Sequence, residues 1–188
     1  MDKRELRQQM RRLKHLLTDE QKQNEAATVF QAIERQMFGK DSHPSVLLYY
    51  SLADELPTHD IVDRWHTLGM PVYLPRMKGD DLEIVLYDGA LRADNDFGVL
   101  EPQGVPSDIT PDFIIVPGMA FDRDCNRLGR GRGFYDRMLR RCRDSIKIGV
   151  ALSCQLVDVV PTDIHDIAMD HLFIGDGQSF TNPHHSEK

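Results

Sequence analysis

Apolar residues near the start of the chain recur every three or four positions, which is the period of an amphipathic helix. Residues 2–17 form the first such segment. Thr18 and Gln21 then form a capping box, a signal that opens a second helix. The apolar positions are Leu6, Met10, Leu13 and Leu17 in the first segment and Ala26, Val29, Phe30, Ile33 and Met37 in the second. The pattern therefore predicts two helices before the first strand.

Continuous apolar runs follow, and these are typical of strands that are covered on both faces. The runs are short, rich in β-branched and aromatic residues, and bounded by Gly, Pro and Asp. They occupy residues 45–52, 72–77, 113–116, 146–153 and 172–174. Residues 82–87 predict a further strand, which we expect to be antiparallel to the strand before it because only a short turn separates the two.

Helical spacing returns between the strands. The apolar positions that carry it are Ile61, Trp65 and Leu68 in one segment and Tyr135, Met138, Leu139 and Cys142 in another. Strands that alternate with helices predict an α/β fold: a mainly parallel central sheet with helices on both faces, an open layered sandwich. A chain of 188 residues is long enough for a sizeable core. We expect residues 1–176 to form a single domain and the polar residues 177–188 to be a disordered tail.

Composition narrows the class of protein. Hydrophobic residues make up 40% of the chain and charged residues 28%, as in ordinary soluble globular proteins. The cysteines (Cys125, Cys142 and Cys154) are odd in number and widely spaced, which suggests neither a disulfide framework nor a zinc site and fits a reducing compartment. No apolar run approaches membrane-spanning length, and the N-terminus has no apolar signal core. We therefore expect a cytoplasmic protein that binds no membrane.

Residues 126–137 hold the most informative pattern, because three glycines alternate there with arginines. The segment follows a buried strand and opens a helix, where free backbone N–H groups and the helix dipole favour an anion. Glycine permits close backbone approach and positive φ, and arginine offers planar donors to phosphate or carboxylate. The segment is not a P-loop, and its third glycine comes one residue too early for a dinucleotide fingerprint. It indicates either a polyanion site, for which nucleotide phosphates are suitable, or a mobile solvated loop.

Charge in this part of the chain differs from the average. The whole protein carries a net charge of −7, which argues against bulk affinity for nucleic acid. Between Gly129 and Arg143, in contrast, there are six arginines and a single acid, Asp136. Such a local concentration of positive charge suits an anionic small molecule better than a long duplex.

Polar residues elsewhere supply further candidates. Lys3, Arg7, Arg11 and Lys14 form a stripe along the first helix, which is either a solvated face or a ligand-binding face. Glu55 follows the first strand, at the end of the sheet where α/β folds bind their ligands, although it could instead be a helix-start carboxylate.

Two Asp–His pairs lie within residues 165–171. Their spacing matches no standard zinc pattern. The carboxylates of Asp166 or Asp170 suit Mg²⁺, particularly when phosphates supply the other ligands.

In order and spacing, these segments resemble the 5-formyltetrahydrofolate cyclo-ligase (methenyltetrahydrofolate synthetase) family. The most specific part of the resemblance is residues 116–122 followed by residues 126–137. The likeness extends over nearly the whole chain and includes the basic opening at 3–7, the turn at 50–58, the Leu-Pro-Arg sequence at 74–76 and the segment at 160–170.

The resemblance implies an enzyme that uses ATP and Mg²⁺ to convert 5-formyltetrahydrofolate to 5,10-methenyltetrahydrofolate, with release of ADP and phosphate. It places ATP at Lys3, Arg4, Arg7, Arg127, Leu128, Gly129, Arg130, Gly131, Arg132, Gly133, Phe134 and Tyr135. It assigns folate contacts to Tyr50 and Glu55, Mg²⁺ contacts to Asp136 and Asp166, and catalysis to Arg130, Gly131, Arg132 and Tyr135. One departure is Phe134, because tyrosine is the more usual residue at that position in the family.

The resemblance also implies the chemistry. The formyl oxygen attacks the γ-phosphate, N10 then attacks the resulting imidate phosphate to close the ring, and phosphate leaves. Loop N–H groups, arginines and Mg²⁺ would neutralise the negative charge that spreads during phosphoryl transfer. On this hypothesis Lys3 and Arg7 become ligands, while Arg11 and Lys14 stay on a solvated face. The expected partner is a small molecule, with no nucleic acid, and we expect a monomer.

Two other functions fit parts of the same pattern. A sugar-phosphate isomerase or transferase would bind phosphate without ATP, would need a base near the glycines and would not need the basic first helix. An RNA-binding module would use residues 3–14 together with the arginines of 130–143. The net charge of −7 and the lack of interleaved exposed aromatics count against the RNA hypothesis.

Overall fold

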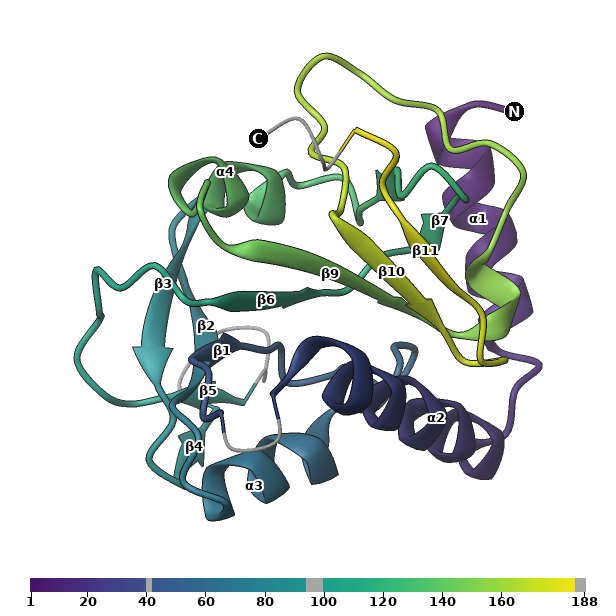
Figure 1. Cartoon of the computed structure of the whole chain (residues 1–188). Coiled ribbons are helices and arrows are strands. Elements are labelled where there is room, and N and C mark those ends of the chain that lie inside the picture. Colours follow the sequence, from purple (N-terminus) through teal and green to yellow (C-terminus); the bar gives the residue numbers. More distant parts are fainter. Residues whose placement is uncertain (40–41, 94–99, 185–188) are drawn as a thin grey trace.

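A computed structural model of the chain describes residues 1–39, 42–93 and 100–184 (Figure 1). Its centre is a seven-stranded sheet with the order β11-β10-β9-β6-β1-β2-β3. The strands are β1 (Val46–Leu47), β2 (Val72–Lys78), β3 (Asp81–Leu86), β6 (Phe113–Val116), β9 (Ile146–Ala151), β10 (His171–Ile174) and β11 (Ser179–Thr181). Neighbouring strands from β10 to β2 run parallel, whereas the two outermost pairs are antiparallel. The α/β class, the mainly parallel sheet and the antiparallel placement of residues 82–87 are confirmed.

Helices lie on both faces of this sheet. They are α1 (Lys3–Lys14), α2 (Asp19–Met37), α3 (His59–Thr67) and α4 (Phe134–Arg141), with a short 3-10 turn, η1 (Ser153–Gln155). Helices α2 and α3 pack against one face and α4 packs against the other, so the layered arrangement is confirmed (Figure 1). Within the described parts of the chain, no helix is long and apolar enough to cross a membrane.

The face covered by α2 and α3 holds a large aromatic core. Trp65 of α3 is completely buried. The rings of Phe30 and Phe38 meet it edge-on, with centroid distances of 5.7 and 5.2 Å. Edge-to-face contacts of this kind add to the stabilisation that burial of the rings provides. This side of the molecule is therefore built on apolar packing.

Helix α1 packs on a small ribbon rather than directly on the main sheet. The ribbon consists of β7 (Ala120–Phe121) and the antiparallel β8 (Arg127–Leu128), and a second ribbon joins β4 (Leu91–Arg92) to β5 (Glu101–Pro102). Leu6 and Met10 of α1 are buried against Ala120, Leu128 and Val160. This docking places the basic side of α1 next to the loop that follows β8.

The expected disordered tail is wrong for the residues that the structure describes. Residues 179–181 form β11, which pairs antiparallel with β10. Phe180 packs against the core, and Asn182 holds the chain end through a backbone bond to Asp170 and a side-chain bond to Met169. Backbone pairing at a sheet edge explains why a polar sequence is ordered here. Residues 185–188 lie outside the described residues.

Candidate active site

The glycine loop between β8 and α4 adopts the backbone conformation that its sequence predicts. Gly131 has φ = 103°, and Gly133, the residue before α4, has φ = 67°. Side chains other than glycine rarely adopt these angles. A Cβ atom on Gly131 would also lie 3.4 Å from the guanidinium carbon of Arg7. The glycines are therefore needed both for the turn into α4 and for the close approach of α1.

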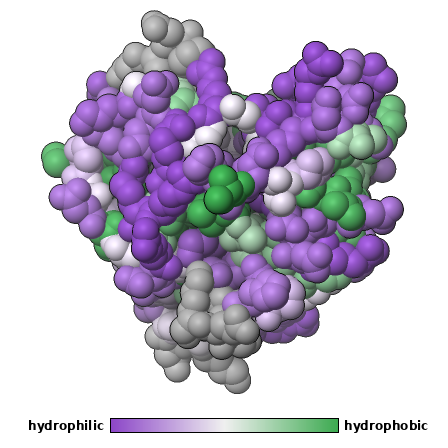
Figure 2. Space-filling model, turned by 90° about the horizontal axis from the view of Figure 1, so that it is seen from above, coloured by the Kyte–Doolittle hydropathy of each residue, from purple (hydrophilic) through white to green (hydrophobic). Residues whose placement is uncertain are grey.

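An open cleft of about 540 Å³ lies over this loop. Its lining contains every residue from Arg127 to Arg137, which takes in β8, the glycine loop and the start of α4. The other lining residues are Lys3, Arg7, Glu55, Pro117, Gly118, Arg140, Asp163, His165 and Asp166. Seven of the lining side chains are lysine or arginine and four are carboxylates, so the cleft is cationic in a protein of net charge −7. Figure 2 looks from above, onto the side where α1 and α4 lie, and this face is mostly hydrophilic. The arrangement suits a polyanion.

Two basic residues of α1 are fixed at the cleft. Arg7 donates from Nε to the carbonyl oxygen of Gly129 at 2.8 Å. Lys3 is ion-paired with Asp166 and, at 2.6 Å, with Asp163. Partial burial on its own would lower the pKa of Lys3, but the hydrogen bonds to these carboxylates outweigh it and raise the pKa above the ordinary value. Lys3 is therefore held as a cation at the rim of the cleft.

Two residues that the resemblance assigned to ligands lie outside the cleft lining. Arg4 is exposed on α1 and is absent from the lining. Tyr50 is partly buried, and its ring stacks on His59 with a centroid distance of 4.0 Å. The other eleven residues assigned to ATP, together with Glu55, Asp136 and Asp166, all line it. The cleft therefore brings together most of the predicted site.

Arg127 faces inward rather than into open space. Its side chain is 3% exposed, and Nη2 donates to Oδ1 of Asp136 at 2.9 Å. Its guanidinium carbon lies 5.6 Å from the ring centroid of Tyr135, whose pKa is raised above the ordinary value by burial. The Nε atom is buried and has no acceptor among the described residues. Arg127 therefore neutralises Asp136 beneath the loop.

The two carboxylates predicted to bind Mg²⁺, Asp136 and Asp166, both line the cleft, and each is ion-paired with a cation of the chain. The described residues contain no cluster of three or more His, Cys, Asp or Glu side chains that could hold a metal alone. Mg²⁺ commonly takes one or two carboxylates and fills its remaining positions with water and phosphate oxygens. The donor set fits a metal that arrives with phosphates and does not fit a permanent metal centre.

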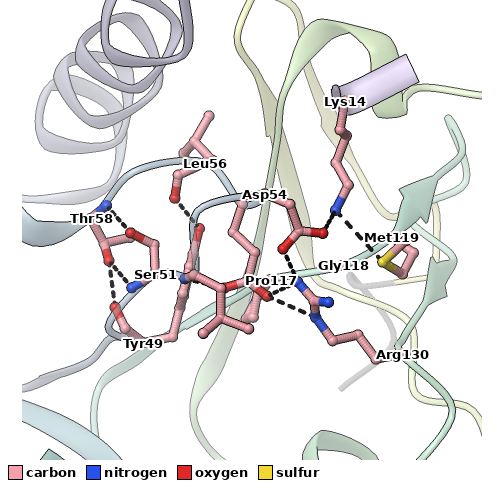
Figure 3. Close-up of polar contacts among 12 residues, drawn as sticks. Lys14, Tyr49, Ser51, Asp54, Leu56, Thr58, Pro117, Gly118, Met119 and Arg130 are labelled. Atoms are coloured by element: carbon pink, nitrogen blue, oxygen red, sulfur yellow. Dashed lines mark hydrogen bonds and ion pairs between the residues drawn. The ribbon is translucent and has the colours of Figure 1, made fainter. Parts of the chain in front are cut away.

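The turn after β1 is a hydrogen-bonded, partly buried structure that presents Glu55. The predicted strand at 45–52 pairs only through Val46–Leu47, because the chain then turns around Thr58. The hydroxyl of Thr58 donates to Tyr49 O at 2.6 Å and accepts from Ser51 N at 3.0 Å (Figure 3). Glu55 Oε2 accepts from Leu52 N at 3.0 Å. The helix-start alternative is not what these bonds show, because Glu55 binds its own turn and points to the cleft.

Glu55 and Arg130, which the resemblance assigned to different ligands, form an ion pair. Arg130 donates to Oε1 of Glu55 from Nε at 3.0 Å and from Nη2 at 2.9 Å, and Nη2 also contacts Asp54. The neighbouring carboxylates raise the pKa of Arg130 above its ordinary value, against the opposing effect of desolvation. One residue predicted to contact folate and one predicted to contact ATP are therefore in direct contact.

Lys14 overturns one sequence prediction. It was expected on the solvated face of the first helix, but its side chain is 0% exposed and Nζ contacts Asp54 Oδ2 at 2.7 Å (Figure 3). The physical reason lies in the helix itself: Lys14 stands four residues after Met10 and eight after Leu6, on the buried stripe. That spacing was the signal that could have identified it.

Half of the arginine cluster fastens α4 to its surroundings. Arg137 donates to the carbonyl oxygen of Asp80, Arg140 to that of His165, and Arg141 to that of Leu82. These contacts hold the helix against the β2–β3 turn and the 163–166 segment. Part of the local charge therefore builds the frame of the cleft, although Arg137 and Arg140 also line it.

One important residue was not singled out by the sequence. Asp122 is 2% exposed and accepts four hydrogen bonds. The donors are Asp124 N, Asn126 N, Asn126 Nδ2 and Val160 N, at 2.9–3.1 Å. A carboxylate can accept this many bonds, and here it joins the β7–β8 turn to the C-terminal segment that carries Asp166. No local periodicity distinguishes such a carboxylate from a surface one.

Comparison with known proteins agrees with this geometry. Residues 1–175 match the model of the 5-formyltetrahydrofolate cyclo-ligase family. The chain is 30% identical to the 5-formyltetrahydrofolate cyclo-ligase of Escherichia coli strain K12, over 85% of this chain and 93% of the relative. It is also 30% identical to the enzyme of that name from Haemophilus influenzae, over 70% of this chain and 75% of the relative.

A solved structure shares the fold. The NMR structure of 5,10-methenyltetrahydrofolate synthetase from Aquifex aeolicus superposes with a TM-score of 0.83 at 29% identity, over 97% of this chain and 94% of the other. The match therefore covers both the N-terminal helix and the glycine loop. The chain belongs to the 5-formyltetrahydrofolate cyclo-ligase family.

Proposed function

We propose that the chain converts 5-formyltetrahydrofolate to 5,10-methenyltetrahydrofolate with ATP as the energy source, in the cleft between α1 and the glycine loop. The observation that carries this proposal is the contact between Arg130 and Glu55. It joins a cationic phosphate-binding loop to a carboxylate suited to a pterin ring, within one cavity. Relatives named for this activity match the chain over most of its length.

The cationic residues of the cleft would hold the triphosphate. Lys3 and Arg7 approach from α1, and Arg130 and Arg132 from the loop. The helix α4 begins at the loop, so its N-terminal N–H groups favour negative charge there. Mg²⁺, held by Asp136 or Asp166 together with phosphate oxygens, would neutralise further charge on the phosphates.

The chemistry requires activation of a formamide oxygen, which is a poor leaving group. The formyl oxygen attacks the γ-phosphate and displaces ADP, which forms an imidate phosphate. N10 then attacks the formyl carbon and loses its proton, the ring closes, and phosphate leaves. Arginines fixed by ion pairs before the reaction need little reorganisation as charge shifts, which is how preorganised groups lower a barrier. Glu55 would orient the pterin by accepting hydrogen bonds from its N–H edge.

A direct assay tests the proposal. Purified protein is mixed with 5-formyltetrahydrofolate, with and without MgATP, and the methenyl chromophore is followed together with the release of ADP. Product should form only with MgATP, in a one-to-one ratio with ADP. A protein with no ATP-dependent product, under conditions where an authentic cyclo-ligase is active, would contradict the proposal and favour a phosphate-binding enzyme that does not use ATP.

A further inference from the structure

Lys14 is a buried cation whose charge must be satisfied inside the protein. Its side chain is 0% exposed, with Nζ 2.7 Å from Asp54 Oδ2 and 3.6 Å from the sulfur of Met119. A buried ammonium without a carboxylate would be strongly unfavourable. The ion pair with Asp54 therefore fixes the end of α1 next to the turn that carries this carboxylate.

Asp54 divides its two oxygens between two cations. Oδ2 accepts from Lys14, and Oδ1 accepts from Nη2 of Arg130 (Figure 3). Burial on its own would raise the pKa of Asp54, but the hydrogen bonds from these two cations lower it below the ordinary value. Asp54 therefore stays ionised and links α1 to the glycine loop.

Glu55 holds the other side of the same guanidinium, but its contact must change during the proposed reaction. Oε1 of Glu55 accepts twice from Arg130, and Oε2 accepts from Leu52 N. If Glu55 is to accept the N–H edge of a pterin, it must loosen its hold on Arg130. The Nη1 atom of Arg130 has no acceptor among the described residues, and the side chain is 40% exposed, so a second acceptor can reach it from the cleft.

We propose that Lys14 and Asp54 are positioning residues for Arg130, which keep its guanidinium at the cleft when Glu55 exchanges it for the substrate. The proposal rests on the proposed function. Asp54 is the partner that stays, because Lys14 fixes its other oxygen, and Glu55 is the partner that leaves. Arg130 then meets a phosphate oxygen with its orientation retained instead of as a freely rotating side chain.

The first test does not depend on activity. The variant Glu55→Gln imitates the released state, and ¹⁵N relaxation of the Arg130 Nε–Hε group, assigned through its loss in Arg130→Lys, reports the order of the side chain. Arg130 should stay ordered in Glu55→Gln and become mobile when Lys14→Met or Asp54→Asn is added. Lys22→Met is the matched control, because Lys22 is also buried and donates to Ala53 O of the same turn at 3.0 Å, without touching Arg130.

The second test uses turnover with saturating folate. Lys14→Met should lower kcat/KM for ATP by about tenfold or more, and Lys22→Met by less than about twofold. The double variant Lys14→Met/Asp54→Asn removes both charges of this ion pair, so it should regain stability lost in Lys14→Met without regaining the order of Arg130 or kcat/KM for ATP. If Lys14→Met does not fold, Asp54→Asn alone decides the same comparison.

A purely structural role would give the opposite pattern. Recovery of turnover along with stability in the double variant would overturn the proposal, and so would an Arg130 side chain that stays ordered in Glu55→Gln/Asp54→Asn. If the wild-type protein has no ATP-dependent turnover, the proposed function fails, and the relaxation measurements still decide whether Lys14 and Asp54 position Arg130.

Discussion

The two sides of the molecule are held together by different forces. Between α2, α3 and the sheet, large apolar side chains such as Trp65 and Phe30 are buried against each other. Around the cleft, segments far apart in the sequence are joined by charged groups, among them Lys3 with Asp166 and Arg130 with Glu55. Apolar packing is insensitive to ligand charge, whereas each ion pair at the cleft can be exchanged for a charged ligand.

This difference suggests a division of tasks. The apolar side sets the free energy of unfolding, because burial of large side chains is the main favourable contribution to folding. Partly exposed ion pairs contribute little to that free energy, but they fix the direction of donors at the cleft. Stability and activity should therefore respond to different substitutions.

The largest effect is expected on the apolar side. Trp65→Ala should lower the free energy of unfolding by about 3–5 kcal/mol, because it leaves a cavity in the core. Leu68→Ala is the control, since Leu68 follows the same helix but is 61% exposed. Chemical denaturation measures both, and ATP affinity measured well below the unfolding transition should change little. A fall in ATP affinity parallel to the loss of stability would contradict the expected separation of stability from ligand binding.

The next largest effect is expected at the cleft, on activity alone. Arg130→Ala should lower kcat/KM for ATP, because a charge-assisted contact is lost. The expected loss of transition-state stabilisation is ~1–3 kcal/mol. Arg143→Ala serves as the control, because Arg143 belongs to the same basic segment but does not line the cleft. Steady-state kinetics and denaturation are measured on the same samples. Unchanged kinetics in Arg130→Ala would show that this side chain does not meet the nucleotide.

Backbone strain should sharpen the comparison further. Gly131→Ala should weaken ATP binding by about 1–2 kcal/mol, because alanine is strained at φ = 103° and the loop must change its backbone to relieve that strain. Gly39→Ala is the control, because a Cβ there makes only ordinary contacts of 3.5 Å or more. Equilibrium nucleotide binding checks the result. Equal affinities for the two variants would mean that the loop conformation is not needed for the ligand.

The smallest effect is a pH dependence of stability from the contact between Lys3 and Asp166. Burial on its own raises the pKa of Asp166, but hydrogen bonds from Lys3 and from Asp163 N lower it below 3.8. A lowered pKa in the folded state gives stability that is present above 3.8 and lost as the pH falls through the folded value. Lys3 has a raised pKa, so its contribution is present below 10.5 and lost as the pH rises above that value.

Lys3→Met should therefore flatten both ends of the stability profile, by at most about 1 kcal/mol because the pair is partly exposed. Urea denaturation at acid, neutral and alkaline pH measures this effect. Arg11→Met is the control, because Arg11 is exposed on the same helix. A pH profile of stability that is identical in Lys3→Met and the wild type would mean that this ion pair contributes nothing.

Much of the fold could be predicted from local patterns, because the helical and strand periods can be read from residues close together in the sequence. The strand after β2 and the turn into α4 could be predicted in this way. The glycine loop was also recognisable, since positive φ and local charge are properties of a short segment. The order of the polar tail could not be predicted. Strand β11 is stabilised by backbone pairing with β10, and this pairing produces no pattern in the side chains of β11.

The ion pairs of the cleft could not be predicted from local sequence patterns either, because their partners are far apart in the sequence. Arg130 and Glu55 stand 75 residues apart, and Lys14 and Asp54 stand 40 apart. The resemblance located Glu55 and the loop separately and could not show that they touch. Lys14 was misplaced because its charge was given more weight than its position on the apolar stripe of α1.

The contact of Lys3 with Asp166 has a consequence for the order in which the protein can be made. The two residues are separated by 163 positions, so α1 leaves the ribosome long before its partners at the cleft exist. Until the ribbon of β7 and β8 and the 163–166 segment have been synthesised, the apolar stripe of α1 and the charge of Lys14 lack their final surroundings. The proposed nucleotide-binding surface is therefore among the last features to assemble, and on the proposed function a nascent chain should gain affinity for ATP only near the end of translation.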